Sequence, residues 1–307
     1  MGQLKIQQVA IVGLGALGVL YAEHFSKRLP KERVEVIADA TRIERYKRDG
    51  IFCNGEPCTF HYVTPEQATP ADLILIATKF DGLSEAIEMI HPIVQKQTII
   101  LSVLNGIISE EEIAKVFGVE HTLYCVAQGM DALKTGNHMT YVNKGLLCIG
   151  ADLEGMEFER LHTVTKFFDE TEFPYEVDPQ MRHRLWGKFM LNVGVNQTVA
   201  AIEGTFHDVQ IEGEARDMMI SAMREVIKIG QAEGIALSEK DLAYWLDILA
   251  TLNPEGKPSM AQDVDAKRKS ELPLFAGTIR KLGVKHQIAT PTNDKLYEII
   301  QAKESNY

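Results

Sequence analysis

Lys188, Asn192 and Asn196 recur at intervals of four residues within the apolar run Leu185–Asn196. A spacing of four places side chains on one face of an α-helix, where these three would span about 12 Å. Asparagine is a poor residue for a helix interior because its amide competes for backbone hydrogen bonds. Two asparagines and a lysine among aromatic and aliphatic side chains therefore indicate a polar groove.

Two interpretations of this stripe fit the pattern equally well. The lysine ammonium can act as a general acid toward a developing alkoxide, while the asparagine amides bind a carboxylate or hydroxyl of a substrate. Alternatively, Lys188 extends past the apolar stem of its own helix to water and the asparagines bond a neighbouring helix. The pattern alone leaves a catalytic and a structural stripe open.

A second candidate site is a glycine-rich run near the N-terminus. Its six residues are Gly13, Leu14, Gly15, Ala16, Leu17 and Gly18. The run follows a predicted strand and opens a predicted helix, so the glycines would permit a tight turn, close approach of a pyrophosphate, and close packing of helix on sheet. Phosphates would lie at the helix N-terminus. The run therefore predicts binding of a dinucleotide, NADP or NAD.

Asp39 and the arginines after it bear on which dinucleotide binds. Asp39 ends the second predicted strand, 21 residues after Gly18. A carboxylate there accepts hydrogen bonds from the ribose hydroxyls and repels a 2′-phosphate, which favours NAD(H). Arg42 and Arg45 either pair with such a phosphate, if Asp39 turns away, or are solvated charges on the next helix. NADP therefore stays open.

Short apolar runs alternate with amphipathic stretches in the first half of the chain. The predicted strands are Gln8–Val12, Val34–Ala38, Leu73–Ala77 and Thr98–Val103, and the predicted helices are Ala16–Leu29, Ser84–Ile93 and Ser109–Val116. The weaker strands Thr122–Ala127, Met139–Val142 and Leu146–Ile149 are expected at the end of the same sheet. This order predicts an α/β, Rossmann-type doubly wound parallel sheet in a dinucleotide-binding domain, residues 1–178.

From about Pro179 onward, apolar residues repeat at intervals of three and four, which is typical of helices. The predicted helices are Gln180–Ala201, Glu214–Glu233, Ser238–Leu252, Ser259–Lys269, Glu271–Leu282 and Thr292–Lys303. In the fifth, Ser270 is expected to cap the helix and Glu271 to lie in its first turn. Residues 179–307 should therefore form an all-α domain, and because it contains the Lys188 stripe, it is the domain in which substrate binding and catalysis are expected.

Length and charge exclude several classes of function. The chain has 307 residues and a net charge of −11, which suggests two domains and argues against nucleic acid or an anionic membrane as a partner. The four cysteines and nine histidines show no spacing typical of a metal site, so no metal is expected. The apolar run Val9–Leu20 is broken by glycines at fixed offsets rather than built like a signal peptide, so we expect a cytoplasmic protein.

The chain resembles the ketopantoate reductases, or 2-dehydropantoate 2-reductases, over essentially its whole length. Besides the glycine run, the resemblance rests on Thr78-Lys79, Leu104-Asn105-Gly106, Leu185-Trp-Gly-Lys188 with Asn192 and Asn196, and Ser259-Met260 followed by Ser270-Glu271. Five ordered blocks are far more specific than the glycine run alone.

This resemblance implies NAD(P)H-dependent reduction of a 2-oxo acid to an (R)-2-hydroxy acid. The first expectation is reduction of 2-dehydropantoate to (R)-pantoate, a step of pantothenate biosynthesis, in a cleft between the two domains. At matching positions, Lys188 is the general acid and Glu271 orients the lysine and the substrate hydroxyl. The positions implied for substrate contacts are Asn192, Asn196 and Ser259, and those implied for the cofactor end are Lys79 and Asn105, the latter also near the substrate.

Three departures from the family pattern bear on the substrate and on the cofactor. The usual Thr-Glu-Ile-Asp is Ser270-Glu-Leu-Pro273 here, a polar contact of some members falls at Phe206, and position 39, often basic in NADPH users, is Asp39. They fit an NADH-dependent D-2-hydroxyacid dehydrogenase acting on an apolar 2-oxo acid. A hypothesis of another class is a non-catalytic nucleotide-sensing protein, against which Lys188 and Glu271 argue. The helical surfaces would also suit a homodimer.

Overall fold

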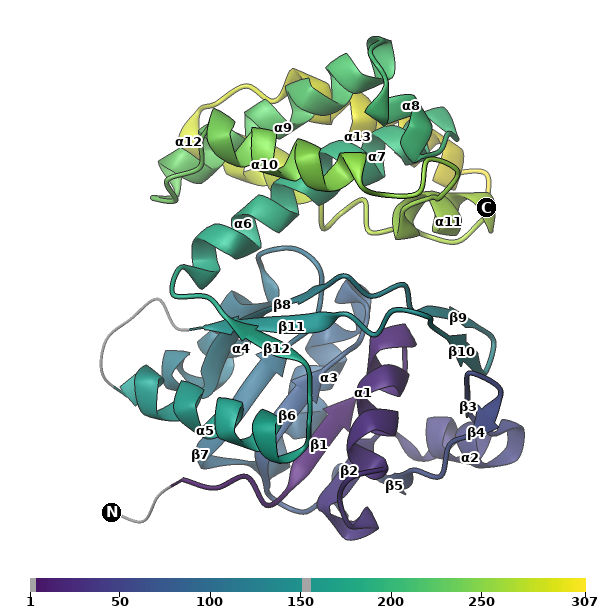
Figure 1. The fold of residues 1–307 in the computed structure, drawn as a ribbon, viewed down its shortest axis with the longest axis vertical. Coiled ribbons are helices and arrows are strands. Elements are labelled where there is room, and N and C mark those ends of the chain that lie inside the picture. The colour runs from purple at the N-terminus through teal and green to yellow at the C-terminus, as the bar shows by residue number, and fades with distance from the viewer. Residues whose placement is uncertain (1–3, 151–155) are drawn as a thin grey trace. The chain divides into compact units, whose positions relative to one another are not determined.

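A computed structural model describes residues 4–150 and 156–307. The chain divides into two compact units (Figure 1). The first contains the residues up to Leu104 together with Ile108–Met181, and the second contains Arg182–Tyr307. The short segment Asn105–Ile107 belongs by its contacts to the second unit, although the chain on either side of it belongs to the first.

An eight-stranded sheet organises the first unit. In spatial order its strands are β12 (Tyr175–Val177), β11 (Leu146–Gly150), β8 (Thr122–Gln128), β7 (Val94–Ser102), β6 (Ala71–Ile76), β1 (Val9–Val12), β2 (Val34–Ile37) and β5 (His61–Val63). The six strands from β8 to β5 pair in parallel. The order reverses between β1 and β6, as in the Rossmann fold, so the predicted fold class is confirmed.

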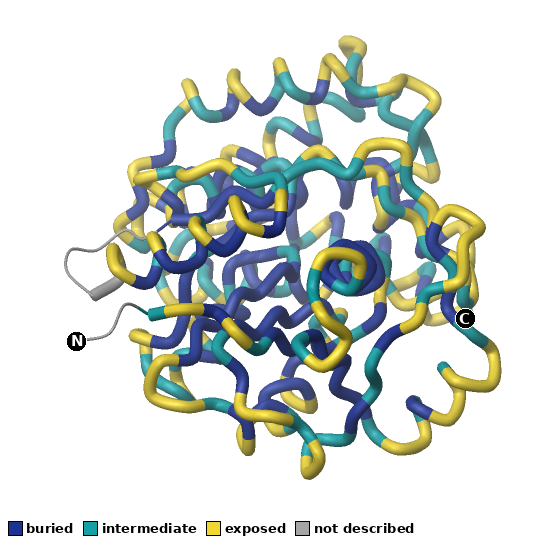
Figure 2. The backbone as a smooth tube through the Cα atoms, turned by 60° about the horizontal axis from the view of Figure 1, so that its bottom comes forward, coloured by how far each residue is buried: buried dark blue, intermediate teal, exposed yellow. Residues whose placement is uncertain are grey.

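Helices cover both faces of this sheet because alternate residues of each strand point to opposite sides. Their bounds are α1 (Ala16–Ser26), α2 (Ala40–Asp49), α3 (Leu83–Ile90), α4 (Ser109–Phe117) and α5 (Met156–Glu170), with 3₁₀ turns at Lys31–Arg33, Phe80–Gly82, His91–Ile93 and Val119–His121. Val9 and Ile11 pack in one core with α1 and α5, whereas Ala10 and Val12 pack in another with α3 and α4. The central strands are therefore buried on both sides (Figure 2).

The predicted strand Met139–Val142 does not join the large sheet, and this prediction was wrong. A strand does form there as β10 (His138–Thr140), but it belongs to a small sheet with β9 (Leu133–Thr135), β3 (Phe52–Cys53) and β4 (Glu56–Pro57). The His138 ring stacks on Phe52 at 4.5 Å, and Met139 is buried in the core beside α1. With no crossover helix between them, β8 and β11 pair antiparallel.

The second unit is helical among its described residues. Its helices are α6 (Met181–Leu191), α7 (Gln197–Ile202), α8 (Phe206–Gln210), α9 (Glu214–Ala232), α10 (Glu239–Ala250), α11 (Ser259–Asp265), α12 (Ala276–His286) and α13 (Pro291–Glu304). Helix α9 lies at the centre and packs against α7, α8, α10, α12 and α13. Met219, Ala222, Met223 and Val226 form its buried stripe at helical spacing.

Two of the predicted helices are reorganised in the structure. The predicted helix Gln180–Ala201 is interrupted by a π turn at Asn192–Asn196, which separates α6 from α7. Helix α12 begins at Ala276, because the segment from Glu271 forms tight turns in which Leu274 and Phe275 donate to the carbonyl of Glu271. Glu271 is therefore in a turn before the helix rather than in its first turn, and that prediction was wrong.

The glycine turn gives a matched test of packing. A Cβ at Gly18 would lie 1.9 Å from the carbonyl oxygen of Gly13, whereas a Cβ at Gly15 would come no closer than 3.4 Å to Ala77. We expect Gly18→Ala to lower the free energy of unfolding by at least about 2 kcal/mol, because backbone atoms must move apart. Gly15→Ala should change it by about 0.5 kcal/mol or less. Urea unfolding followed by circular dichroism measures both, and equal losses in the two variants would contradict the argument.

Candidate active site

The glycine run forms the turn from β1 into α1. Gly13 has a φ of +92°, and a Cβ there would approach the Ala77 carbonyl oxygen to 2.8 Å. Gly15 is the N-cap of α1, where no side chain caps the helix and no acidic residue lies in the first turn. The first backbone N–H groups of α1 thus stand at the switch point between β1 and β6 without a side-chain cap. A pyrophosphate fits this place.

Asp39 lies at the end of β2, as predicted, and caps α2. Its Oδ1 accepts a hydrogen bond from the backbone N–H of Arg42 at 2.8 Å. The Arg42 guanidinium lies 3.2 Å from Oδ2 of Asp39 and forms two hydrogen bonds, of 2.6 and 2.9 Å, with the carboxylate of Glu85. The guanidinium of Arg45 lies over the Tyr46 ring at 5.5 Å. Arg42 is thus paired with the carboxylates of Asp39 and Glu85. The condition for Arg42 to bind a 2′-phosphate, an Asp39 side chain turned away from it, is not met.

Lys79 follows β6 and precedes the 3₁₀ turn at Phe80–Gly82, for which it is the N-cap. Its side chain is exposed. The carboxyl end of β6 borders the switch point, where ligands of open α/β sheets bind. Its place is thus consistent with a role at the cofactor end.

Within the second unit, the structure brings three predicted residues together. The ammonium of Lys188 lies 3.4 Å from Oδ1 of Asn105, and Nδ2 of Asn105 donates to the carboxylate of Glu271 at 3.0 Å. A single amide therefore accepts from the cation and donates to the anion. All three residues are half-buried.

Close packing of turns and helices fixes these three side chains. The turn at Gly106 has a φ of +93°, and a Cβ there would lie 2.8 Å from Leu274, so the Asn105 turn is seated on the Glu271–Leu274 turn. Next to Lys188, Gly187 lets Trp245 of α10 approach, since a Cβ would lie 2.5 Å from its ring nitrogen. Two glycines thus permit the contacts that bring the residues together.

Asn192 and Asn196 are buried, with 7% and 8% of their surface exposed. Asn192 lies about 40° around the α-helix from Lys188. In the wider π turn, with about 4.4 residues per turn, the next four residues fall about 30° short of a full turn. Asn196 therefore returns to about the direction of Lys188, whereas an unbroken α-helix would have turned it about 80° away. The π turn therefore brings Lys188, Asn192 and Asn196 closer to one direction around the helix axis than an unbroken α-helix would.

Ser259 is exposed at the first residue of α11, a helix that packs against α7 and the π turn. Phe206 begins α8, and its backbone N–H donates to the carbonyl of Gly256 at 2.9 Å. A Cβ at Gly256 would lie 3.1 Å from the Phe206 ring. The ring therefore packs on the loop that leads to Ser259.

Glu110 is a residue that the sequence did not single out. It lies in the first turn of α4, 2% exposed, and accepts a hydrogen bond from Ser109, which in turn accepts one from Ser102 at the end of β7. Burial raises the pKa of its carboxyl to about 7. These bonds join the two ends of the loop that carries Asn105. An acidic residue after a serine is common at helix starts, so only the structure reveals its burial.

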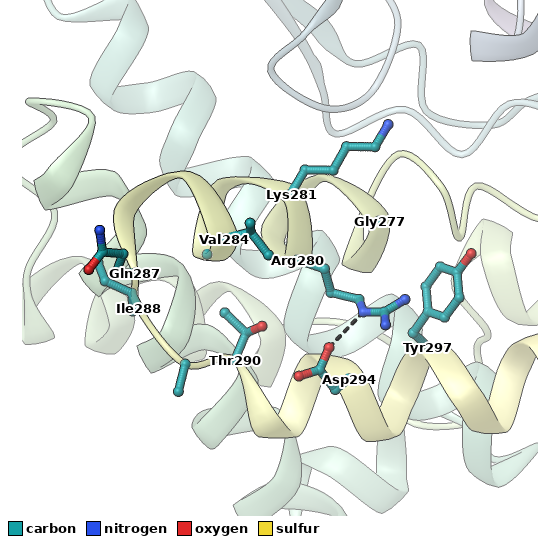
Figure 3. Close-up of a pocket in the computed structure, with 11 residues that line it drawn as sticks. Gly277, Arg280, Lys281, Val284, Gln287, Ile288, Thr290, Asp294 and Tyr297 are labelled. Atoms are coloured by element: carbon teal, nitrogen blue, oxygen red, sulfur yellow. Dashed lines mark hydrogen bonds and ion pairs between the residues drawn. The ribbon is translucent and has the colours of Figure 1, made fainter.

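A separate hollow of 580 Å³ lies between α12 and α13 (Figure 3). There Arg280 pairs with Asp294 at 2.6 Å and its guanidinium lies 4.2 Å from the centre of the Tyr297 ring. None of the predicted site residues lines this hollow. These contacts join the two helices, and we assign the hollow no part in the site.

No group of three or more His, Cys, Asp or Glu side chains in residues 4–150 and 156–307 is placed to hold a metal ion. Over the same part of the chain, no helix is both long enough and apolar enough to cross a membrane.

Comparison with family models matches the chain at two places. Residues 9–152 match the family described as ketopantoate reductase PanE/ApbA, and residues 180–304 match the one described as its C-terminal part. A 2-dehydropantoate 2-reductase of Streptococcus pyogenes is 26% identical over 304 residues, covering 97% of this chain and 98% of its own. One of Aquifex aeolicus is 24% identical over 305 residues, covering 97% of each.

Solved structures share the fold at about one-fifth identity. A D-mandelate dehydrogenase with NADH and anilino(oxo)acetate has a TM-score of 0.84 at 21% identity, covering 97% of this chain and 99% of its own. A ketopantoate reductase from Ralstonia eutropha has a TM-score of 0.81 at 22% identity, with the same coverage. A dimeric ketopantoate reductase from Staphylococcus aureus has 0.76 at 21%, again with 97% and 99% covered. These likenesses show the fold and leave the substrate open.

The buried carboxyl of Glu110 predicts a specific dependence of stability on pH. Its pKa is about 7 in the folded chain against an ordinary 4.5. Between these values the folded chain holds a proton that the unfolded chain has released, so stability falls as pH rises through this window. Glu110→Gln should remove this fall and be more stable than the wild type at pH 8 by up to about 3 kcal/mol.

Urea unfolding at pH 5 and pH 8 measures this difference. Exposed Glu111, the next residue of α4, supplies the control, and Glu111→Gln should keep the pH dependence of the wild type. A Glu110→Gln variant that loses stability in parallel with the wild type would show that the carboxyl does not cause the fall.

Proposed function

The chain belongs to the ketopantoate reductase family, which makes it an NAD(P)H-dependent oxidoreductase, and from this membership we propose that it reduces a 2-oxo acid to an (R)-2-hydroxy acid. The substrate we propose first is 2-dehydropantoate, with (R)-pantoate as product, as a step of pantothenate biosynthesis. The observation that carries the proposal is the amide of Asn105 between the ammonium of Lys188 and the carboxylate of Glu271.

In the proposed mechanism Lys188 is the general acid. When bound, a dihydronicotinamide would supply the hydride for the carbonyl carbon of the substrate. The ammonium donates a hydrogen bond to the carbonyl oxygen, stabilises the negative charge that develops there, and gives up a proton to it. Glu271 accepts a hydrogen bond from the substrate hydroxyl, and Asn105 keeps the acid and the carboxylate in register.

The remaining polar residues bind the two ligands in this proposal. Asn192, Asn196 and Ser259 bind the carboxylate and hydroxyl of the substrate without adding charge. The backbone from Gly13 to Gly18 would hold the pyrophosphate, and Lys79 and Asn105 would contact the cofactor at its nicotinamide end. Residues 1–178 would then be the dinucleotide-binding domain and residues 179–307 the substrate domain.

NADH is the cofactor that the geometry at Asp39 favours. The carboxylate is fixed by the backbone N–H of Arg42 after β2, the position at which an acidic side chain binds the ribose hydroxyls in Rossmann folds. The guanidinium of Arg42 is already paired with Glu85, which leaves it poorly placed for a 2′-phosphate. We therefore propose a preference for NADH over NADPH.

A second candidate is an NADH-dependent D-2-hydroxyacid dehydrogenase acting on an apolar 2-oxo acid. The observation in its favour is Phe206 of α8, whose aromatic ring packs on the loop before Ser259 and stands where some family members place a polar contact. The ring of Phe206 cannot form a conventional hydrogen bond with a substrate hydroxyl, whereas an apolar side chain of a substrate would pack on it. A sensor without turnover is less favoured, since it needs no proton donor beside a carboxylate.

Two broader features complete the proposal. The four cysteines are free thiols, which supports a reducing compartment such as the cytoplasm as the place of action. A homodimer is proposed as the assembly because the related Staphylococcus aureus enzyme is described as dimeric. Light scattering of the purified chain, which gives its molar mass in solution, tests whether it is a homodimer.

Steady-state oxidation of NADH and NADPH tests the activity. The 2-oxo acids to compare are ketopantoate, 2-oxoisovalerate, 2-oxoisocaproate and phenylglyoxylate. We expect the highest kcat/KM with ketopantoate, while a higher value with one of the apolar acids would support the second candidate. If no 2-oxo acid supports oxidation of either cofactor, the proposed reaction is wrong.

Lys188→Ala tests the general acid. Loss of a positioned proton donor should lower kcat by about 10²- to 10⁴-fold with the fold intact by circular dichroism. Exposed Lys228 of α9 is the matched control, and Lys228→Ala should keep kcat within about twofold. Unchanged turnover in Lys188→Ala would exclude the lysine as the acid.

Asp39→Asn tests the cofactor preference. Asparagine keeps the capping oxygen for α2 but removes the negative charge, so the fold should be retained. The ratio of kcat/KM for NADH to that for NADPH should fall by at least about tenfold, because the 2′-phosphate no longer meets a carboxylate. Asp49→Asn, at the other end of α2, should leave the ratio unchanged. A ratio that stays the same in both variants would assign the preference to other residues.

A further inference from the structure

We propose that Gln197 is a positioning residue for the reaction. From inside the helical unit, it fixes the turn that carries Glu271 relative to the π turn that carries Asn192 and Asn196. This inference rests on the proposed function for its meaning in catalysis. Gln197 bonds to Val193, Asn293 and Ala276 rather than to the catalytic cluster, so it acts through the segments that carry that cluster and the asparagines.

Gln197 is fully buried and uses both ends of its amide. Its Oε1 accepts from the backbone N–H of Ala276 at 2.8 Å. Its Nε2 donates to the carbonyl of Val193 at 2.7 Å and to Oδ1 of Asn293 at 3.1 Å. One planar group thus joins the π turn, the start of α12 and the start of α13.

Asn293 and Glu225 anchor this amide. Asn293 is fully buried, and its Nδ2 donates to Glu225 at 2.7 Å. The Glu225 carboxylate, 6% exposed, also accepts from the backbone N–H groups of Thr292 and Asn293 at 2.8 and 3.0 Å, so it caps the N-terminus of α13. An anion is favoured at a helix N-terminus. The orientation of the Asn293 amide is therefore fixed, with its oxygen toward Gln197.

The bond to Ala276 reaches the Glu271 turn. Ala276 is the first residue of α12, and the tight turns from Glu271 to Phe275 lead directly into it. The backbone in these turns is folded back on itself, since Gly277 donates to the carbonyl of Leu272 and Phe275 to that of Glu271. Because these hydrogen bonds hold the turns together, a displacement of the Ala276 backbone would also displace the Glu271 carboxylate.

The bond to Val193 reaches the π turn. Val193 lies between Asn192 and Asn196, and the Gln197 amide adds a donor to its carbonyl. On the other side of the turn, a Cβ at Gly194 would lie 2.4 Å from Met223, so the turn is pressed against α9. A π turn in a helix needs such support because an α-helix is the more favourable geometry. Gln197 thus fixes both the turn and the directions of its asparagines.

Gln197→Met tests the inference, because methionine fills the same space and makes none of the three hydrogen bonds. Gln210 gives the matched control: its half-buried amide donates to the carbonyls of Leu249 and Leu252 in the same unit, away from the Glu271 turn. We expect Gln197→Met to lower kcat by about 10- to 100-fold with the KM for the 2-oxo acid changed less than about threefold. Gln210→Met should keep kcat within about twofold when both variants are folded.

Gln197→Glu supplies the rescue. Position 197 faces the carbonyl of Val193, Oδ1 of Asn293 and the N–H of Ala276, with the Glu225 carboxylate one amide away. Two facing oxygens and a nearby carboxylate favour a protonated glutamic acid, which still accepts from Ala276 and donates to one oxygen. At pH 6 it should therefore recover kcat to within about fivefold of the wild type.

Crystal structures of the variants give a readout that does not need turnover. The distance from Nδ2 of Asn105 to the Glu271 carboxylate is 3.0 Å in the wild type. It should exceed about 3.5 Å in Gln197→Met and keep the wild-type value in Gln210→Met. An unchanged distance, or equal losses of kcat in the two methionine variants, would overturn the inference. If the wild type itself reduces no 2-oxo acid, the proposed function fails, and the crystallographic distance still decides the structural claim.

Discussion

The amide of Asn105 is the interaction on which the rest of the proposed site depends. It accepts from the Lys188 ammonium and donates to the Glu271 carboxylate, and its planarity fixes the angle between these two contacts. A rotated α6 or a displaced turn before α12 would break one of them. The packing of Gly106 on Leu274 and of Trp245 on Gly187 therefore serves the same geometry as the hydrogen bonds themselves.

Features that depend on neighbouring residues were predictable from the sequence. The glycine turn, the alternation of strands and helices in a parallel sheet, and Asp39 after β2 follow from periodicity and from glycine offsets, and the structure confirms them, whereas the edge strands β5 and β12 and helix α5 were not predicted. Strand β10 was assigned to the wrong sheet, because its partner Phe52 lies more than 80 residues away along the chain and no local pattern predicts their pairing. Register between distant segments is a tertiary property.

The candidate site was predictable only in part, for a related reason. Spacing indicated the Lys188 stripe, but not the π turn, which forms where Gln197 and Met223 meet the backbone of residues 193 and 194. The resemblance placed Asn105 and Glu271 near the ligands without showing that they bond each other. Glu110, Glu225 and Asn293 carried no signal, because burial of a polar side chain is decided by elements that pack over it.

The polar interior of the helical unit is built around neutral amides. Gln197 and Asn293 join the ends of three helical segments, and the carboxylate among them, Glu225, is held by backbone N–H groups at the start of α13. Amides carry direction without net charge, so Gln197 and Asn293 orient these segments without adding a charge to the helical unit. That matters in a chain with a net charge of −11, where an anionic 2-oxo acid must be attracted locally. Charges beyond about 8 Å are screened at physiological ionic strength, so a nearby ammonium outweighs a distant surplus of acid.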